Sequence, residues 1–172
     1  MALPQAQFDA QIRAALDVDE ALRTAALYLL CGIGDIYFSG GLPHNLRLYA
    51  PANAAGPAHL LPWDMDFVFN DATSSSIYPA TSYNFGKLML NPTTKRLYLS
   101  QVYDLCQRVF NAGYMSPWLA SYGAVVGQSY TGQATYINNR RAYALSQMPA
   151  AAPFAITSNG GNDFSTNTTT VT

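Results

Sequence analysis

The chain has 172 residues, of which 49% are hydrophobic and only 11% are charged, a balance typical of a domain that folds around a core. Its formal net charge of -1 provides no basic surface for a phosphate backbone, so nucleic acid is excluded as an expected partner. No apolar run reaches the roughly 18 residues that a membrane-spanning helix needs, and we therefore expect no span.

Two helices are expected at the start of the chain. Apolar residues recur at helical spacing from Phe8 to Leu16. Asp17 and Glu20 form a capping-box pattern, with Asp in place of Ser or Thr, which predicts that a second helix begins there. This second helix is apolar on most sides near its end, so we expect it to be buried and to stop at Gly32 and Gly34.

A loop and a β-hairpin are expected next. Three glycines and a proline between residues 34 and 45 argue against regular structure in that segment. Residues 46–49 and 59–69 have the pattern of two strands, and the segment 51–57 between them predicts the connecting turn.

Four helices are expected in the second half of the chain, after a polar loop at residues 70–84. Asn91-Pro92 is expected to break the first helix, and Thr94 to cap the second, which ends by Gly113. Ser116-Pro117 is expected to open the third. Arg140-Arg141 on the last helix is interpreted as a solvated face, with a phosphate contact as the alternative. The expected bounds are near 83–89, 94–110, 116–126 and 134–148.

The cysteines and histidines do not form a motif in the sequence. Cys31 and Cys106 lie in apolar helical stretches and are expected to be buried free thiols, a disulfide being the alternative. His44 and His59 have no Cys or Glu at ligand spacing, so a zinc site is not expected. His44 is interpreted as a loop residue near the candidate site.

The composition changes after Pro149. Residues 150–153 resemble a linker, and the rest of the chain is rich in Ser, Thr, Asn and Gly. We interpret residues 1–149 as one partial domain. Residues 150–172 are interpreted as a linker and the start of a truncated β-sandwich domain, a flexible tail being the alternative.

The strand-like segment 59–69 contains two aspartates. If this segment is extended, Asp64 and Asp66 point to the same face. Two carboxylates in an apolar strand are costly to bury unpaired, and a bound Mg²⁺ would offset that cost. The alternative is that both aspartates cap backbone amides or pair with a nearby Arg or Lys.

Two further polar residues precede these aspartates. Asp35 lies in a glycine-flanked loop that can present a carboxylate to a cleft, and Asn45 opens the first strand. A turn role is the alternative for each. Protein kinases use a loop Asp, a nearby Asn and a later Asp, in this order, as base and metal ligands. Asp35, Asn45 and Asp64 follow the same order.

Three short motifs in the chain resemble the successive signatures of the CotH kinase family. The most telling is Pro-Trp-Asp-x-Asp, and the resemblance covers roughly residues 17–148. It implies an α+β, mostly helical fold: the large lobe of an atypical protein kinase with a central β-hairpin, at residues 1–149. The small lobe is expected to be missing. The motifs are Ile33-Gly34-Asp35, Asn45-Leu46-Arg47-Leu48-Tyr49 and Leu61-Pro62-Trp63-Asp64-Met65-Asp66.

The resemblance also implies a reaction and roles for the site residues. Asp35 would be the catalytic aspartate, Asn45 and Asp64 would hold Mg²⁺ on the ATP phosphates, and Asp66 would support the site or touch the metal. The parent protein would transfer the γ-phosphoryl group of ATP to Ser or Thr of a protein partner. By the same resemblance it would be extracellular or on the cell surface, with further β-sandwich domains.

Two departures from the kinase pattern limit this expectation. The spacing from Asp35 to Asn45 is longer than in ordinary kinases. No glycine-rich phosphate loop and no strand lysine precede Asp35, so this chain is expected to be inactive by itself. A non-catalytic surface scaffold or adhesion module, with structural or Ca²⁺-binding aspartates, is the alternative function. A metal-dependent phosphohydrolase would need more His and Asp ligands.

Overall fold

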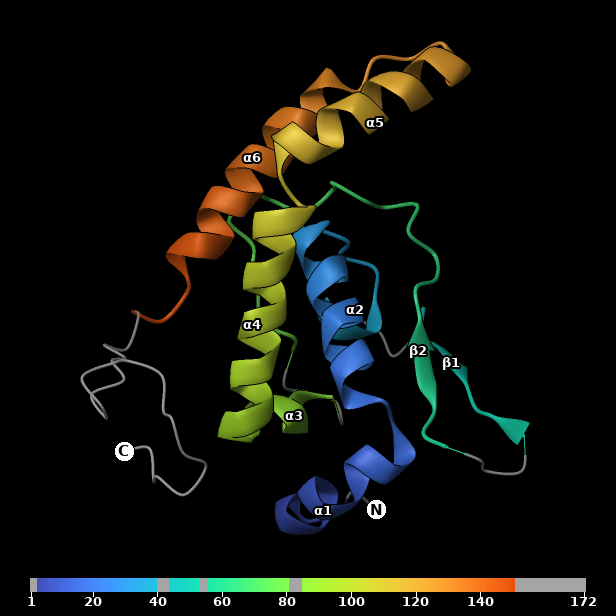
Figure 1. Ribbon diagram of the computed structural model, residues 1–172, viewed down its shortest axis with the longest axis vertical. Helices are drawn as coiled ribbons and strands as arrows, with labels where there is room; N and C mark the ends of the chain where they lie inside the picture. Colours follow the sequence, from blue (N-terminus) through green and yellow to red (C-terminus); the bar gives the residue numbers. More distant parts are fainter. Residues whose placement is uncertain (1–2, 40–43, 53–55, 81–84, 151–172) are drawn as a thin grey trace, which may run out of the picture.

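The computed structural model describes residues 3–39, 44–52, 56–80 and 85–150. Within these ranges the protein is mostly helical, with a single two-stranded antiparallel sheet (Figure 1). The α+β class expected from the sequence is therefore confirmed. The expected β-sandwich start at residues 151–172 lies outside the described residues. The elements are α1 (Gln5–Ala15), α2 (Val18–Leu30), the 3-10 turn η1 (Tyr37–Ser39), β1 (Arg47–Tyr49), β2 (His59–Leu61), α3 (Gly86–Leu90), α4 (Pro92–Arg108), α5 (Ala112–Val126) and α6 (Thr131–Ser146).

Helix α2 is the centre of the fold. It lies between α4 and the hairpin, while α5 and α6 pack side by side beyond one end of the α2–α4 pair (Figure 1). Most of its residues are buried, as its apolar pattern predicts. The Asp17 side chain accepts a hydrogen bond from the Glu20 amide at 3.1 Å, which confirms the expected cap. The helix ends at Leu30 with Cys31 as its C-cap, and the following Gly32 has a φ of 63°, a left-handed value that glycine adopts without strain.

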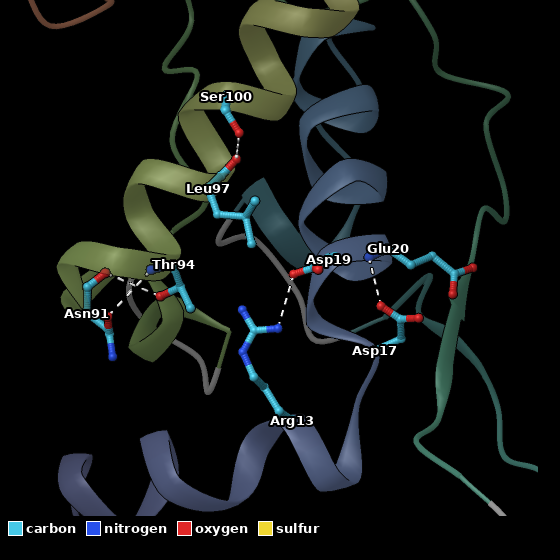
Figure 2. A network of polar contacts seen from close by, with 8 residues as sticks. All are labelled: Arg13, Asp17, Asp19, Glu20, Asn91, Thr94, Leu97 and Ser100. Carbon is cyan, nitrogen blue, oxygen red and sulfur yellow. Dashed lines mark hydrogen bonds and ion pairs between the residues drawn. The ribbon is translucent and has the colours of Figure 1, made fainter. Parts of the chain in front are cut away.

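The start of α4 differs from the expected one. Asn91, not Thr94, is the cap: its side-chain oxygen accepts from the amides of Thr93 at 2.9 Å and Thr94 at 3.4 Å. Pro92 is then the first helical residue, where a missing amide proton costs nothing. The buried Thr94 hydroxyl donates instead to the carbonyl of Leu88 and to that of Asn91 (Figure 2). Asn91-Pro92 thus separates α3 from α4 and also starts α4. The expected start of α3 at residues 83–84 lies outside the described residues.

The start of α5 also differs. Asn111 caps it by accepting from the Tyr114 amide at 2.9 Å, so Gly113 lies inside α5 and does not end the preceding helix. Pro117, expected to be near the first position, lies in the second turn. Pro117 has no amide proton to donate to the carbonyl of Gly113, four residues earlier. Gly113 is exposed, so water can bond to this carbonyl instead.

The hairpin is confirmed but its second strand is shorter than expected. β1 and β2 pair antiparallel, with Leu48 opposite Leu60. The strand stops at Leu61, because Pro62 has no amide to donate and Asp64 adopts a φ of 55°. Residues 66–69 form a turn. The prediction that Asp64 and Asp66 share one face of an extended strand is therefore wrong.

Backbone hydrogen bonds hold the hairpin and the segment after it along α2. Asp17 donates its amide to the Ala58 carbonyl at 2.8 Å, near the start of α2. At the other end, Phe69 donates to the Cys31 carbonyl at 2.7 Å and Asp71 to the Gly32 carbonyl at 3.0 Å. The chain that leaves β2 thus runs beside α2 to its last turn (Figure 1).

Arg140 on α6 is wholly buried, so its interpretation as part of a solvated face is wrong. Its guanidinium donates to four backbone carbonyls, at 3.0, 2.5, 2.7 and 3.2 Å. The neighbouring Arg141 donates its Nε to the Cys106 carbonyl at 2.7 Å. Arg140 therefore joins α6, the end of α2 and the loop before α3. Its four acceptors are Thr73, Ser75, Leu29 and Ser76.

Cys31 and Cys106 are buried free thiols, as expected. Burial raises the pKa of the Cys31 thiol from its ordinary 9.0 to about 12, although the charge of Arg140 opposes the shift. Burial likewise raises the pKa of Cys106 to about 11, with Arg141 and Arg140 opposing. A raised pKa in the folded state means that stability is complete below pH 9 and is lost as the pH rises above it.

The free energy of unfolding is therefore expected to fall by about 2 kcal/mol between pH 8 and pH 10, because unfolded thiols release protons that the folded ones retain. Urea titrations at several pH values measure this. In a variant with Cys31→Ala and Cys106→Ala, whatever its starting stability, this slope should fall by at least half, and the remainder comes from Tyr28, Tyr98 and Tyr136, whose pKa burial also raises. Equal slopes in the two proteins would contradict the assignment to the thiols.

Candidate functional site

Two of the expected site residues, Asp35 and Asn45, lie next to each other. The Asn45 side-chain amide donates to the backbone carbonyl of Asp35 at 2.8 Å. The ring of His44 contacts the Asp35 carboxylate, with 2.5 Å between Nε2 and Oδ1. Residues 40–43, which connect these groups, lie outside the described residues. The structure thus brings the predicted base and the predicted amide ligand together.

The contact made by Asn45 determines which way its amide faces. A backbone carbonyl only accepts, so the atom facing it must be the amide nitrogen, and the amide oxygen remains available. Asn45 adopts a left-handed φ of 55°, which Asn tolerates better than most residues. The amide oxygen makes no hydrogen bond with another residue in the described part of the chain, so it is a candidate metal ligand.

The Asp35 carboxylate is presented by a loop with buried anchors on both sides. Ile33 and Ile36 are each 1% exposed, whereas 49% of the Asp35 side chain is exposed. A Cβ added at Gly34 would lie 2.6 Å from an oxygen of Asp71, so glycine permits this close approach. The loop is held in place while its carboxylate faces outward, with one oxygen on His44.

Asp64 follows a peptide that is held on α2 and β1. The Tyr28 hydroxyl of α2 donates to the Trp63 carbonyl at 2.5 Å and accepts from the Trp63 amide. The Arg47 guanidinium carbon lies 3.9 Å from the centroid of a Trp63 ring. Burial raises the pKa of Tyr28, its hydrogen bond to Trp63 opposes this, and the charge of Asp64 adds to it. Asp64 therefore lies near the last turns of α2.

Asp64 and Asp66 are both exposed, so the expected cost of burying them does not arise. Neither carboxylate forms a hydrogen bond or an ion pair with another residue in the described part of the chain. The alternative in which they cap amides or pair with Arg or Lys thus finds no support among these residues. Both carboxylates are available to a ligand.

Tyr28 connects the two halves of the candidate site. Its ring contacts that of Phe38, just after the Asp35 loop, at a centroid distance of 5.9 Å, and its hydroxyl holds Trp63. Among the described residues, however, Asp35, Asp64 and Asp66 do not form a group whose ligand atoms all lie within 4.8 Å of one another. Their convergence on one cation therefore stays a prediction.

A comparison with known protein families shows which family the chain belongs to. The family described as CotH kinase protein matches residues 2–157 of the chain. The chain belongs to the CotH kinase family. No curated protein matches it. The match extends beyond the 17–148 segment noted from the sequence and includes every described helix and strand. None of the described helices is long and apolar enough to cross a bilayer.

Sequence reasoning missed the role of Tyr28 in this CotH-family chain. The residue lies in an apolar helix and looks like core material, yet a buried phenol needs a hydrogen-bond partner. The requirement for a partner could have indicated a polar contact of Tyr28, but the apolar residues around it favoured its interpretation as a core residue. The partner, Trp63, is 35 residues away in sequence and could not be identified from the sequence.

The Tyr28→Phe variant is expected to lose about 1–2 kcal/mol of stability, because both hydrogen bonds to the Trp63 peptide disappear. Urea unfolding measures this loss. Tyr103→Phe is the matched control: Tyr103 is 54% exposed, and its variant should change stability by less than about 0.5 kcal/mol. Equal stability of the two variants would show that the Trp63 contact contributes nothing.

Proposed function

We propose that this CotH-family chain is the metal- and phosphate-handling lobe of an atypical protein kinase. In the longer parent protein it would transfer the γ-phosphoryl group of ATP to Ser or Thr of a protein partner. The observation that carries the proposal is the contact between Asn45 and Asp35, inside a segment that matches a kinase family. Kinases use a loop Asp and a nearby Asn in the same order.

The donor set suits Mg²⁺. Asn45 offers an amide oxygen, and Asp64 and Asp66 offer exposed carboxylates. Mg²⁺ is bound by oxygen ligands of these kinds. In the proposal Asn45 and Asp64 hold the ion on the ATP phosphates, and Asp66 supports them. The ion would supply charge neutralisation on the transferring phosphoryl group.

Asp35 is the proposed catalytic base. Its Oδ1 is occupied by His44, and its second oxygen makes no hydrogen bond with the described residues. In the proposal that second oxygen accepts the proton of the substrate hydroxyl, while His44 orients the carboxylate. His44 is a positioning residue in this arrangement, because it acts through Asp35.

The proposal also assigns the remaining parts of the chain and its location. In this proposal the small nucleotide-gripping lobe belongs to the parent protein, and the expected linker and β-sandwich start at residues 150–172 lie, from residue 151 on, outside the described residues. The parent is extracellular or on the cell surface, as expected from the family resemblance. The alternative function is a non-catalytic scaffold, in which the carboxylates of Asp64 and Asp66 bind Ca²⁺ and no nucleotide is bound.

The test uses the parent protein with its small lobe. The proposal predicts Mg²⁺-dependent transfer of labelled phosphate from ATP to a protein acceptor, and binding of Mg²⁺-ATP in calorimetry. Binding of Ca²⁺ with neither nucleotide binding nor transfer would contradict it and favour the scaffold. Release of free phosphate without any phosphorylated protein would favour a phosphohydrolase.

A further inference from the structure

A second group of ligand-bearing side chains lies at the opposite end of α2. Asp17 caps the helix, Glu20 lies in its first turn, and His59 is the first residue of β2. One carboxylate oxygen of each acid and one ring nitrogen of His59 all lie within 4.8 Å of one another. It is the sole His, Cys, Asp and Glu group of this kind in the ranges that the structure describes.

The three side chains are held by the backbone around them. Leu16 and Ala58 form a parallel bridge, and Ala58 donates to the Ala15 carbonyl at 2.9 Å. These bonds fix the residues just before Asp17 against the residue just before His59. In Figure 2 the Glu20 side chain extends from α2 toward the hairpin. The group is thus built from two anchored segments.

The atoms that face one another are suitable metal ligands. His59 Nδ1 lies 2.5 Å from Glu20 Oε2 and 3.9 Å from Asp17 Oδ2. The other oxygen of Asp17 accepts the Glu20 amide, so Oδ2 is the atom left to bind. The side chains are between 35% and 40% exposed, so water can complete a coordination shell.

We propose that Asp17, Glu20 and His59 bind a divalent transition-metal ion of the Zn²⁺ type. One imidazole with two carboxylates suits Zn²⁺, whereas Mg²⁺ and Ca²⁺ favour all-oxygen sites. The two carboxylates balance the charge of the ion. Tetrahedral ligands about 2.0–2.1 Å from Zn²⁺ are roughly 3.4 Å apart, so on binding the His59–Glu20 contact of 2.5 Å opens by about 0.9 Å and the Asp17–His59 distance of 3.9 Å closes by about 0.5 Å.

The competing interpretation is an ion pair between His59 and Glu20 without metal. Pairs at this exposure contribute little to stability. The bound ion would link the start of β2 to the start of α2. Both segments precede the one that carries Asp64. This inference does not depend on the kinase proposal, because the two sites share no residue.

Calorimetric titration of the 172-residue chain with ZnCl₂ tests the site. We expect one Zn²⁺ per chain, at least tenfold weaker binding in His59→Asn and Glu20→Gln, and no competition from Mg²⁺. His44→Asn is the matched control: His44 also lies 2.5 Å from a carboxylate, but among the described residues it belongs to no group of three possible ligands. This variant should therefore bind Zn²⁺ as the unaltered chain does.

Thermal melting with and without Zn²⁺ provides the second readout. Zn²⁺ should raise the melting temperature of the unaltered chain and of His44→Asn, and of neither other variant. If His59→Asn does not fold, Glu20→Gln decides, because the Glu20 amide that Asp17 caps is retained. Absence of Zn²⁺ binding, or equal binding in the unaltered chain and the Glu20→Gln variant, would overturn the proposal.

Discussion

Replacing Arg140 with methionine is expected to lower the free energy of unfolding by about 3–5 kcal/mol, enough to unfold a marginally stable chain. The guanidinium is wholly buried and donates to four backbone carbonyls. Methionine fills similar space but leaves all four acceptors without a donor. The variant should therefore lose the link between α6, the end of α2 and the loop at residues 73–76.

Arg141→Met is the control for this experiment, one position along the same helix. Arg141 makes one short backbone contact, to Cys106, so its loss should cost about 1 kcal/mol. Circular dichroism and urea unfolding compare the two variants. If both were equally stable, the four carbonyls would be satisfied in another way, and Arg140 would not be the central polar contact of the fold.

Asp64→Asn and Asp35→Asn are expected to lower phosphate transfer in the parent protein strongly, and for different reasons. Loss of the Asp64 charge removes a metal ligand, so Mg²⁺-nucleotide binding should weaken at least tenfold along with transfer. Loss of the Asp35 charge removes the base, so transfer should fall by about 10²–10⁴. Nucleotide affinity should then stay within about threefold of the original value.

Calorimetry with a non-hydrolysable ATP analogue and a labelled-phosphate assay separate the two effects. Asp19→Asn is the matched control, because Asp19 is an exposed residue of α2 that pairs with Arg13 at 3.2 Å (Figure 2). It should retain both binding and transfer. Unchanged transfer in Asp35→Asn and Asp64→Asn would remove these residues from the mechanism.

The helices could be predicted because their signals are local. The apolar spacing of α2 and the Asp17 cap lie within a few residues of each other, and both are confirmed. The errors arose where two local signals competed. Thr94 and Ser116-Pro117 are good caps in isolation, but Asn91 and Asn111 precede them and start each helix earlier. The β-rich segment after Leu61 was interpreted as strand although Pro62 ends the pairing.

The candidate site was predictable only in part, for the same reason. Asp35, Asn45 and Asp64 belong to short motifs, whereas the contact between Asp35 and Asn45 was seen only in the structure. The partners of Tyr28 and His59 are 35 and 39 residues away in sequence, and no spacing rule identifies them. The group around His59 was missed because its acids come from another element.

The central claim is that Asn45 and Asp64 share one cation beside Asp35, and a crystal structure of the parent protein with Mn²⁺ and an ATP analogue tests it most directly. Anomalous scattering from Mn²⁺ locates the ion. We expect it about 2.0–2.3 Å from the Asn45 amide oxygen and an Asp64 carboxylate oxygen, with Asp35 facing the terminal phosphate. An ion on the nucleotide that touches neither Asn45 nor Asp64 would contradict the account.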